Sequence, residues 1–143
     1  MSVSVSSIRS RLATRIETLS GWKQSPFRFE AFGLDPSSIA HLAFAVGMGK
    51  TEAMPSRQRR DVGVDCKTPF TIRFTARVRP KDAPASVDEA LDAAQTLVNE
   101  VMVVDPTWPA DFQILFVSSE HTALDDFIRH DVIFTAYHLL ALQ

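Results

Sequence analysis

The sequence predicts a single α+β domain in which two main helices pack on a mostly antiparallel or mixed sheet of about four strands. The length of 143 residues is common for one domain, and no repeat or linker-like tract divides residues 1–143. Two segments have apolar residues at helical spacing, and four others have the length and apolar pattern of strands. The expected order is helix, strand, long loop, strand, helix, strand, strand.

The two helices are expected at residues 7–19 and 87–103. The first has an apolar stripe at helical spacing, formed by Ile8, Leu12, Ile16 and Leu19. The second has the longest such stripe, and Ser86 with Glu89 three residues later resembles a capping box at its start. Each of these helices therefore has one face suited to cover a sheet.

The four strands are expected at residues 40–47, 70–79, 112–118 and 131–142. The strand at 70–79 alternates apolar residues with polar or basic ones, so one of its faces belongs in the core. The strand at 131–142 is apolar on both faces and has to be covered twice. Either it lies centrally beneath two layers, or one of its faces meets another subunit.

A mobile basic loop is expected at about residues 48–63, because this stretch has glycines, a proline and no apolar period. Loops longer than about 12–15 residues in compact domains are uncommon and are usually functional or disordered. Basic side chains occur both in this loop and on the strand that follows it: Lys50, Arg57, Arg59, Arg60, Arg73, Arg77 and Arg79.

Three interpretations of these basic residues remain open. They can contact a phosphate backbone and give affinity that falls with salt. They can meet acidic residues such as Asp88, Asp92 and Glu100 on a neighbouring subunit, where charge complementarity sets the register. They can also form a solvated surface with neither role.

The segment Gly47 to Thr51 ends in Gly-Lys-Thr, as does a phosphate-binding P-loop. The complete pattern needs glycine where this chain has Phe44, and a helix should follow, whereas Pro55 and a basic tract follow here. We therefore expect a glycine-rich connection without nucleotide, and an enzyme ranks only third among the functional interpretations.

Other candidate chemistry is also weak. His121, Asp125, Asp126 and His130 have metal-compatible spacing on a helix, but nothing selects the three convergent ligands of a metal site. We expect these residues to lie on the surface of a short helix. The single cysteine, Cys66, has no intrachain partner for a disulfide or a CxxC motif. The sequence thus predicts no catalytic, cofactor-binding or metal-binding residues.

The composition agrees with a folded domain that acts without a membrane. Hydrophobic residues make up 45% of the chain, and the net charge of -2 argues against a whole-domain electrostatic contact with nucleic acid. No apolar run approaches the roughly 18 residues of a membrane span, and the opening residues do not resemble a secretion signal.

The pattern as a whole resembles the tail-terminator proteins of long-tailed bacteriophages and phage-like particles. The features that carry this resemblance are the helix SIRSRLATRIETL, the long loop, the basic strand FTIRFTARVR, the capped helix SVDEALDAAQTLVNEVM and the closing strand FTAYHLLAL. They span most of the chain, but they are patterns rather than an invariant catalytic motif.

The resemblance implies a non-enzymatic structural protein of the virion, assembled in the cytoplasm of the bacterial host and located at the head–tail junction. A homo-oligomeric hexameric ring would cap the tail tube, stop its elongation and provide a docking surface for a head-completion or neck protein. DNA would pass through the ring lumen, and neither a cofactor nor a small-molecule substrate would be needed.

The resemblance also implies an interface formed by the basic residues above together with Tyr137 and Leu139 of the last strand. Two alternatives are another head–tail neck or connector component, and a nucleic-acid-binding accessory domain that uses the loop and strand arginines.

Overall fold

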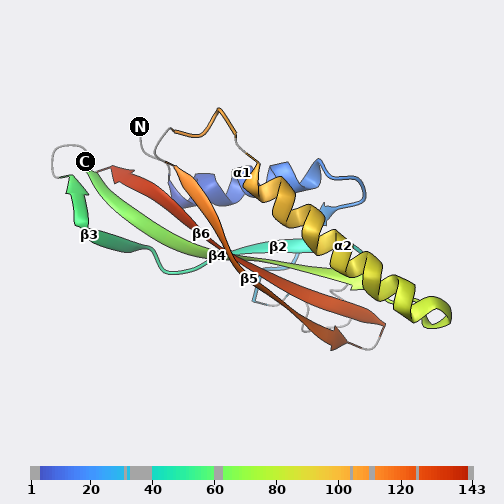
Figure 1. The fold of residues 1–143 in the computed structure, drawn as a ribbon. Helices are drawn as coiled ribbons and strands as arrows, with labels where there is room; N and C mark the ends of the chain where they lie inside the picture. Colours follow the sequence, from blue (N-terminus) through green and yellow to red (C-terminus); the bar gives the residue numbers. More distant parts are fainter. Residues whose placement is uncertain are drawn as a thin grey trace.

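The computed structural model describes residues 4–30, 32, 40–59, 63–103, 105–109, 112–124 and 126–141. Within these residues two helices and six strands form a single α+β unit, which confirms the predicted fold class (Figure 1). In chain order the elements are α1 (Val5–Glu17), β1 (Lys23–Gln24), β2 (Ala43–Met48), β3 (Glu52–Arg59), β4 (Gly63–Arg77), the 3₁₀ turn η2 (Pro80–Asp82), α2 (Ala83–Met102), β5 (Gln113–Leu124) and β6 (Phe127–Ala141).

The sheet is built around two long antiparallel strands, β4 and β6, which pair along their whole length. The strand order is β1-β2-β4-β6-β5, and among the strand pairs of the described residues only the short β1–β2 pair is parallel. Strand β3 also pairs with β4, beside the Gly63–Lys67 end, whereas β2 pairs with the Phe70–Thr75 part. Strands β2 and β3 therefore follow one another along the same edge of β4, and β5 forms the opposite edge of the sheet.

Both helices pack on one face of this sheet (Figure 1). Ile8, Leu12 and Ile16 of α1 are buried in the core cluster. Ala90, Leu97 and Val101 are among the α2 residues in the same cluster. The alternation predicted for the strand at 70–79 is confirmed, since its inward side chains are buried: Phe70, Ile72, Phe74 and Ala76. Periodic apolar residues thus locate the core correctly.

The other face of the sheet is covered near β2 by the segment that contains Phe29 and Phe32. Phe32 is fully buried against Ala43 and Ala45, and Phe29 packs at the edge of this small cluster. Arg73 fixes the segment, because its guanidinium donates to the carbonyl oxygens of Phe29 and Phe32 at 3.4 and 3.3 Å. One end of the sheet therefore has a cover on both faces.

The expected mobile loop is wrong over residues 52–59, which form strand β3. Its backbone pairs with β4 at Glu52–Lys67 and again at Gln58–Val64, with an irregularity between. Strand β4 accordingly begins at Gly63, well before the predicted residue 70. Arg60 lies outside the described residues.

Two further expectations about local structure are wrong. His121 and His130 face each other across the β5–β6 hairpin, and neither lies on a helix; Asp125 is outside the described residues. Helix α2 begins at Ala83 rather than after Ser86, because Pro84 is tolerated in the first turn of a helix. The Ser86 hydroxyl instead accepts a hydrogen bond from the backbone N–H of Arg79 at 3.0 Å.

Candidate protein–protein interface

Strand β5 is an exposed edge with apolar side chains. Among the described residues its outer edge has no strand partner, and from Leu115 to Ala123 every side chain is exposed. Leu115, Phe116 and Val117 are 40%, 43% and 56% exposed. A bulge between Phe116 and Ser118 interrupts the pairing with β6 at this point. Proteins usually protect such edges with proline, lysine or a covering element, and β5 contains neither residue type.

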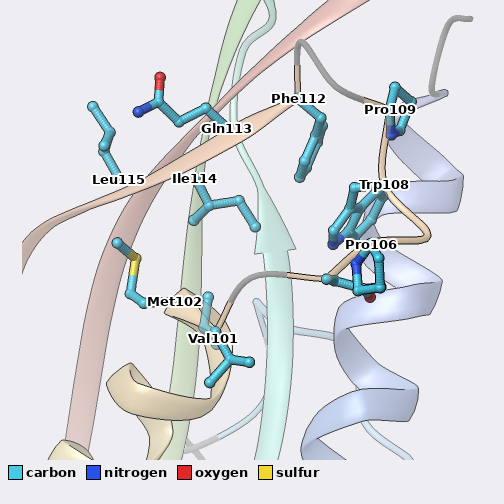
Figure 2. A pocket seen from close by; sticks show the side chains of 11 residues that line it. Val101, Met102, Pro106, Trp108, Pro109, Phe112, Gln113, Ile114 and Leu115 are labelled. Carbon is cyan, nitrogen blue, oxygen red and sulfur yellow. The ribbon is translucent and has the colours of Figure 1, made fainter.

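A cavity of about 680 Å³ lies beside the start of this strand, next to the C-terminal end of α2 (Figure 2). Its wall combines apolar side chains of α2, the following connection and β5: Val101, Met102, Pro106, Trp108, Pro109, Phe112, Ile114 and Leu115. Met102 and Val103 at its rim are 38% and 51% exposed. The pocket and the exposed edge therefore form one continuous apolar surface, here called the β5 surface, which comprises the pocket wall, Val103, Phe116 and Val117.

An aromatic stack forms one wall of the pocket. The Trp108 and Phe112 rings are stacked at a centroid distance of 4.1 Å. The Arg11 guanidinium of α1 lies over the Trp108 indole, 3.7 Å from the ring centroid. Such cation–π contacts stabilise by about 0.5–2 kcal/mol. The stack connects α1 to the segment between α2 and β5.

Charged groups hold the same segment in place. Arg15 donates to Glu100 and to Asp105, each at 3.2 Å. Asp105 accepts from the backbone N–H of Thr107 at 2.8 Å, and the hydrogen bonds from Thr107 hold the pKa of this carboxyl below its usual value. The wall of the pocket is thus fixed by contacts with both helices rather than formed when a ligand arrives.

Charge is distributed unequally between the two edges of the sheet. At neutral pH every formally charged side chain of α2 and β5 is a carboxylate: Asp88, Glu89, Asp92, Glu100 and Glu120. The opposite edge, made by β1, the β2–β3 connection and β3, contributes Lys23, Lys50, Arg57 and Arg59 against Glu52. We call these the acidic edge and the basic edge. Glu89 and Glu100 are paired with Arg79 and Arg15, so the exposed negative charge of the acidic edge comes from Asp88, Asp92 and Glu120.

The strand arginines of the predicted interface do not form one free basic stripe. Arg73 is 15% exposed and makes a two-pronged ion pair with Asp131, with distances of 2.8 and 3.3 Å. Arg79 lies beyond the end of β4 and pairs with Asp82 and Glu89, which lowers the pKa of the Glu89 carboxyl. Arg77 is exposed, with its guanidinium 5.7 Å from the Phe127 ring centroid.

The remaining predicted interface residues are divided between surface and interior. Lys50 is exposed between β2 and β3, and Arg57 and Arg59 belong to β3. Tyr137 is half-buried on β6, whereas Leu139 is only 3% exposed and is already covered within the chain. The β5 surface is not predicted by the sequence analysis. The run of four consecutive apolar residues Ile114–Val117 is the pattern that could have indicated it.

The Gly-Lys-Thr segment does not have P-loop geometry. Gly47 belongs to β2, Gly49 donates its N–H to the carbonyl of Pro69 at 2.7 Å, and a strand rather than a helix follows. The Thr51 hydroxyl is hydrogen bonded to Thr68 at 2.8 Å. This connection therefore lacks the helix N-terminus that holds phosphate in a P-loop.

The histidine pair also lacks the partners of a metal site. The His121 and His130 rings are 5.5 Å apart, and His130 stacks on Phe74 at 4.8 Å. Burial, with a smaller contribution from His121, lowers the pKa of His130 to about 4. Within the described parts of the chain, no group of three or more His, Cys, Asp or Glu residues is arranged to hold a metal ion.

Comparison with known proteins gives no relative: no family model and no curated protein matches this chain. Among the described residues, neither helix combines the length and apolar character that crossing a membrane would require. The geometry and charge of the surface thus have to support the function by themselves.

Proposed function

We propose that this protein is a structural assembly protein that forms a ring on the end of a phage-type tail tube, stops its elongation and offers a docking surface to the head or neck. The observation that carries the proposal is the β5 surface, an apolar strand edge with a preformed pocket. Contiguous exposed apolar surface on a small domain is typical of a protein–protein interaction site.

The separation of charge supports a ring rather than a two-fold dimer. A two-fold interface uses the same patch on both subunits, so two acidic edges would face each other and repel. A head-to-tail interface joins two different patches, and it closes into a ring when the rotation between subunits permits. The acidic and basic edges on opposite sides of one sheet suit this second arrangement.

The test is a tube-assembly reaction with the tail-tube protein from the same genome. Tube protein polymerises alone or with increasing amounts of this protein, and negative-stain electron microscopy records the tube lengths and ends. We expect shorter tubes that carry a ring at one end, with a length distribution that shifts with the added protein. Unchanged tube lengths and bare ends would refute the proposed function.

A neck or connector component is the nearest alternative, since such a component could form a ring through the same two edges. The two functions differ in the surface that the ring recognises. Binding to the isolated head portal, with no effect on tube length, would favour the neck component.

A nucleic-acid-binding accessory domain is the second alternative, and the basic edge is the observation that favours it. Binding of duplex DNA at low and high salt tests it, because phosphate contacts lose affinity steeply as salt rises. Tight, salt-dependent binding by a monomer would replace the ring proposal.

A further inference from the structure

We infer that the acidic edge of one copy, with its β5 surface, receives the basic edge of a second copy, so that neighbouring sheets meet edge to edge around the assembly. This inference rests on the proposed function in one respect, namely that copies of this chain assemble with one another. It goes further by assigning the two surfaces that meet.

The first argument is the state of the β5 edge. Strand β5 is 12 residues long, and within the described chain its outer N–H and C=O groups have no strand partner. Its single formally charged residue is Glu120, beside the exposed apolar side chains Leu115, Phe116 and Val117. An exposed edge of this kind is a template for strand addition, in which main-chain hydrogen bonds supply affinity and adjoining pockets supply specificity.

The second argument is that the pocket is already built where the edge begins. Figure 2 shows Ile114 and Leu115 of β5 on one side of it and Trp108 and Phe112 on the other. The Arg11–Trp108–Phe112 stack fixes that second side, so little ordering cost remains when an apolar side chain enters. A partner strand that follows β5 would meet this pocket at one end.

The third argument identifies the partner by charge. Asp88 and Asp92 of α2 and Glu120 of β5 are exposed carboxylates, so a basic partner is favoured over an acidic one. The opposite edge of the same sheet contains basic residues, with Lys23 in β1, Lys50 before β3, and Arg57 and Arg59 in the β3 sequence. A second copy therefore supplies both the strand edge and the charge that β5 lacks.

The basic edge is less open than β5, which limits the length of any shared ladder. Pro55 in β3 has no N–H to donate, and the pairing of β3 with β4 shifts between Ala53 and Gln58. A short ladder is expected, with the pocket and the opposed charges providing the rest of the contact. The association should accordingly weaken as salt rises.

The experiment measures self-association of the full chain by multi-angle light scattering and native mass spectrometry, at low and high salt. One variant blocks β5 with Val117→Pro, at the bulge where a missing N–H is tolerated best. Val117→Lys is a milder second variant that keeps the N–H. The basic edge is reversed by Arg57→Glu with Arg59→Glu, and its matched control is Arg9→Glu with Lys81→Glu, two exposed residues outside both edges. Circular dichroism checks that each variant folds.

We expect the wild type and the matched control to assemble, while each edge variant associates at least about tenfold more weakly, a loss of about 1.4 kcal/mol. Mixing Val117→Pro with the basic-edge variant should give a one-to-one dimer, because each brings one intact edge that fits the other. A two-fold β5–β5 interface could not produce this dimer.

Three results would overturn the inference. The first is a wild type that stays monomeric at about 1 mM in low salt, a concentration at which even millimolar affinity would be detected. The second is a set of folded edge variants that assemble like the wild type, and the third is a mixture of the two edge variants that gives no dimer. The second and third results leave the proposed function intact if the wild type still caps tubes. Tubes that are never capped while copies do associate through these edges would reject the proposed function alone.

Discussion

Acid should destabilise this protein in part through one buried imidazole, that of His130. This side chain is 2% exposed and lies flat against Phe74, with the two rings 4.8 Å apart. Burial lowers its pKa from 6.5 to about 4, so the folded state favours the neutral form. The resulting contribution to stability is fully present above about pH 6.5 and is lost as the pH falls towards 4. At pH 4 the linkage amounts to about 3 kcal/mol.

The test compares the wild type with His130→Phe, which keeps an aromatic ring against Phe74 but cannot be protonated. Urea unfolding followed by tryptophan fluorescence gives the free energy of unfolding at several values between pH 4 and 7.5. Between pH 7 and 4 the wild type should lose about 3 kcal/mol more than His130→Phe. Carboxylate titration affects both proteins and cancels in this difference. His121→Gln serves as the control that retains the buried imidazole, and equal losses in all three proteins would refute the reasoning.

Three further predictions concern stability and reactivity. Arg73→Ala leaves the nearly buried carboxylate of Asp131 without its ion pair and should lower the free energy of unfolding by about 2–4 kcal/mol in urea titrations. Replacing both residues with leucine should lower it by less, because no charge is then left unpaired. A change below about 0.5 kcal/mol in Arg73→Ala would contradict the role of this pair. Gly63→Ala should lower the melting temperature, because the backbone φ of +155° disfavours a side chain and the added methyl would collide with the carbonyl oxygen of Leu140; an unchanged melting temperature would show that the strand end adjusts freely. Burial raises the pKa of the Cys66 thiol, so in native protein at pH 8 Ellman's reagent should react only as fast as the chain opens, whereas immediate reaction would contradict the buried position.

The sequence predicts the core of this fold well, because the core depends on local periodicity. Helix α2 and the inward face of β4 follow directly from their apolar spacing. Strand β3 is different, since Glu52–Arg59 has a proline and no alternation. It forms a strand because its backbone pairs with β4, and that pairing has no signature in side-chain pattern.

The candidate interface is harder to predict for a related reason. Phe116 and Val117 are exposed on β5, which lies at the edge of the sheet, and no local pattern encodes that position. The same holds for Arg73, whose partner Asp131 is far along the chain and meets it only through the β4–β6 register. Sequence alone identifies which residues are basic, but the fold decides which of them remain available to a partner.

The paired strands β4 and β6 also determine the reach of the molecule. Each has 15 residues, which corresponds to roughly 50 Å of extended backbone before twist shortens it. The β3–β4 tip and the β5–β6 tip lie at opposite ends of this ribbon (Figure 1). Removing two consecutive residues from each of the two strands, at paired positions, would shorten the ribbon by about 7 Å. All remaining side chains would keep their faces, because side chains alternate with a period of two. In an assembly built from such subunits, the length and register of the β4–β6 pair would therefore set the distance between subunit contacts made at its two ends.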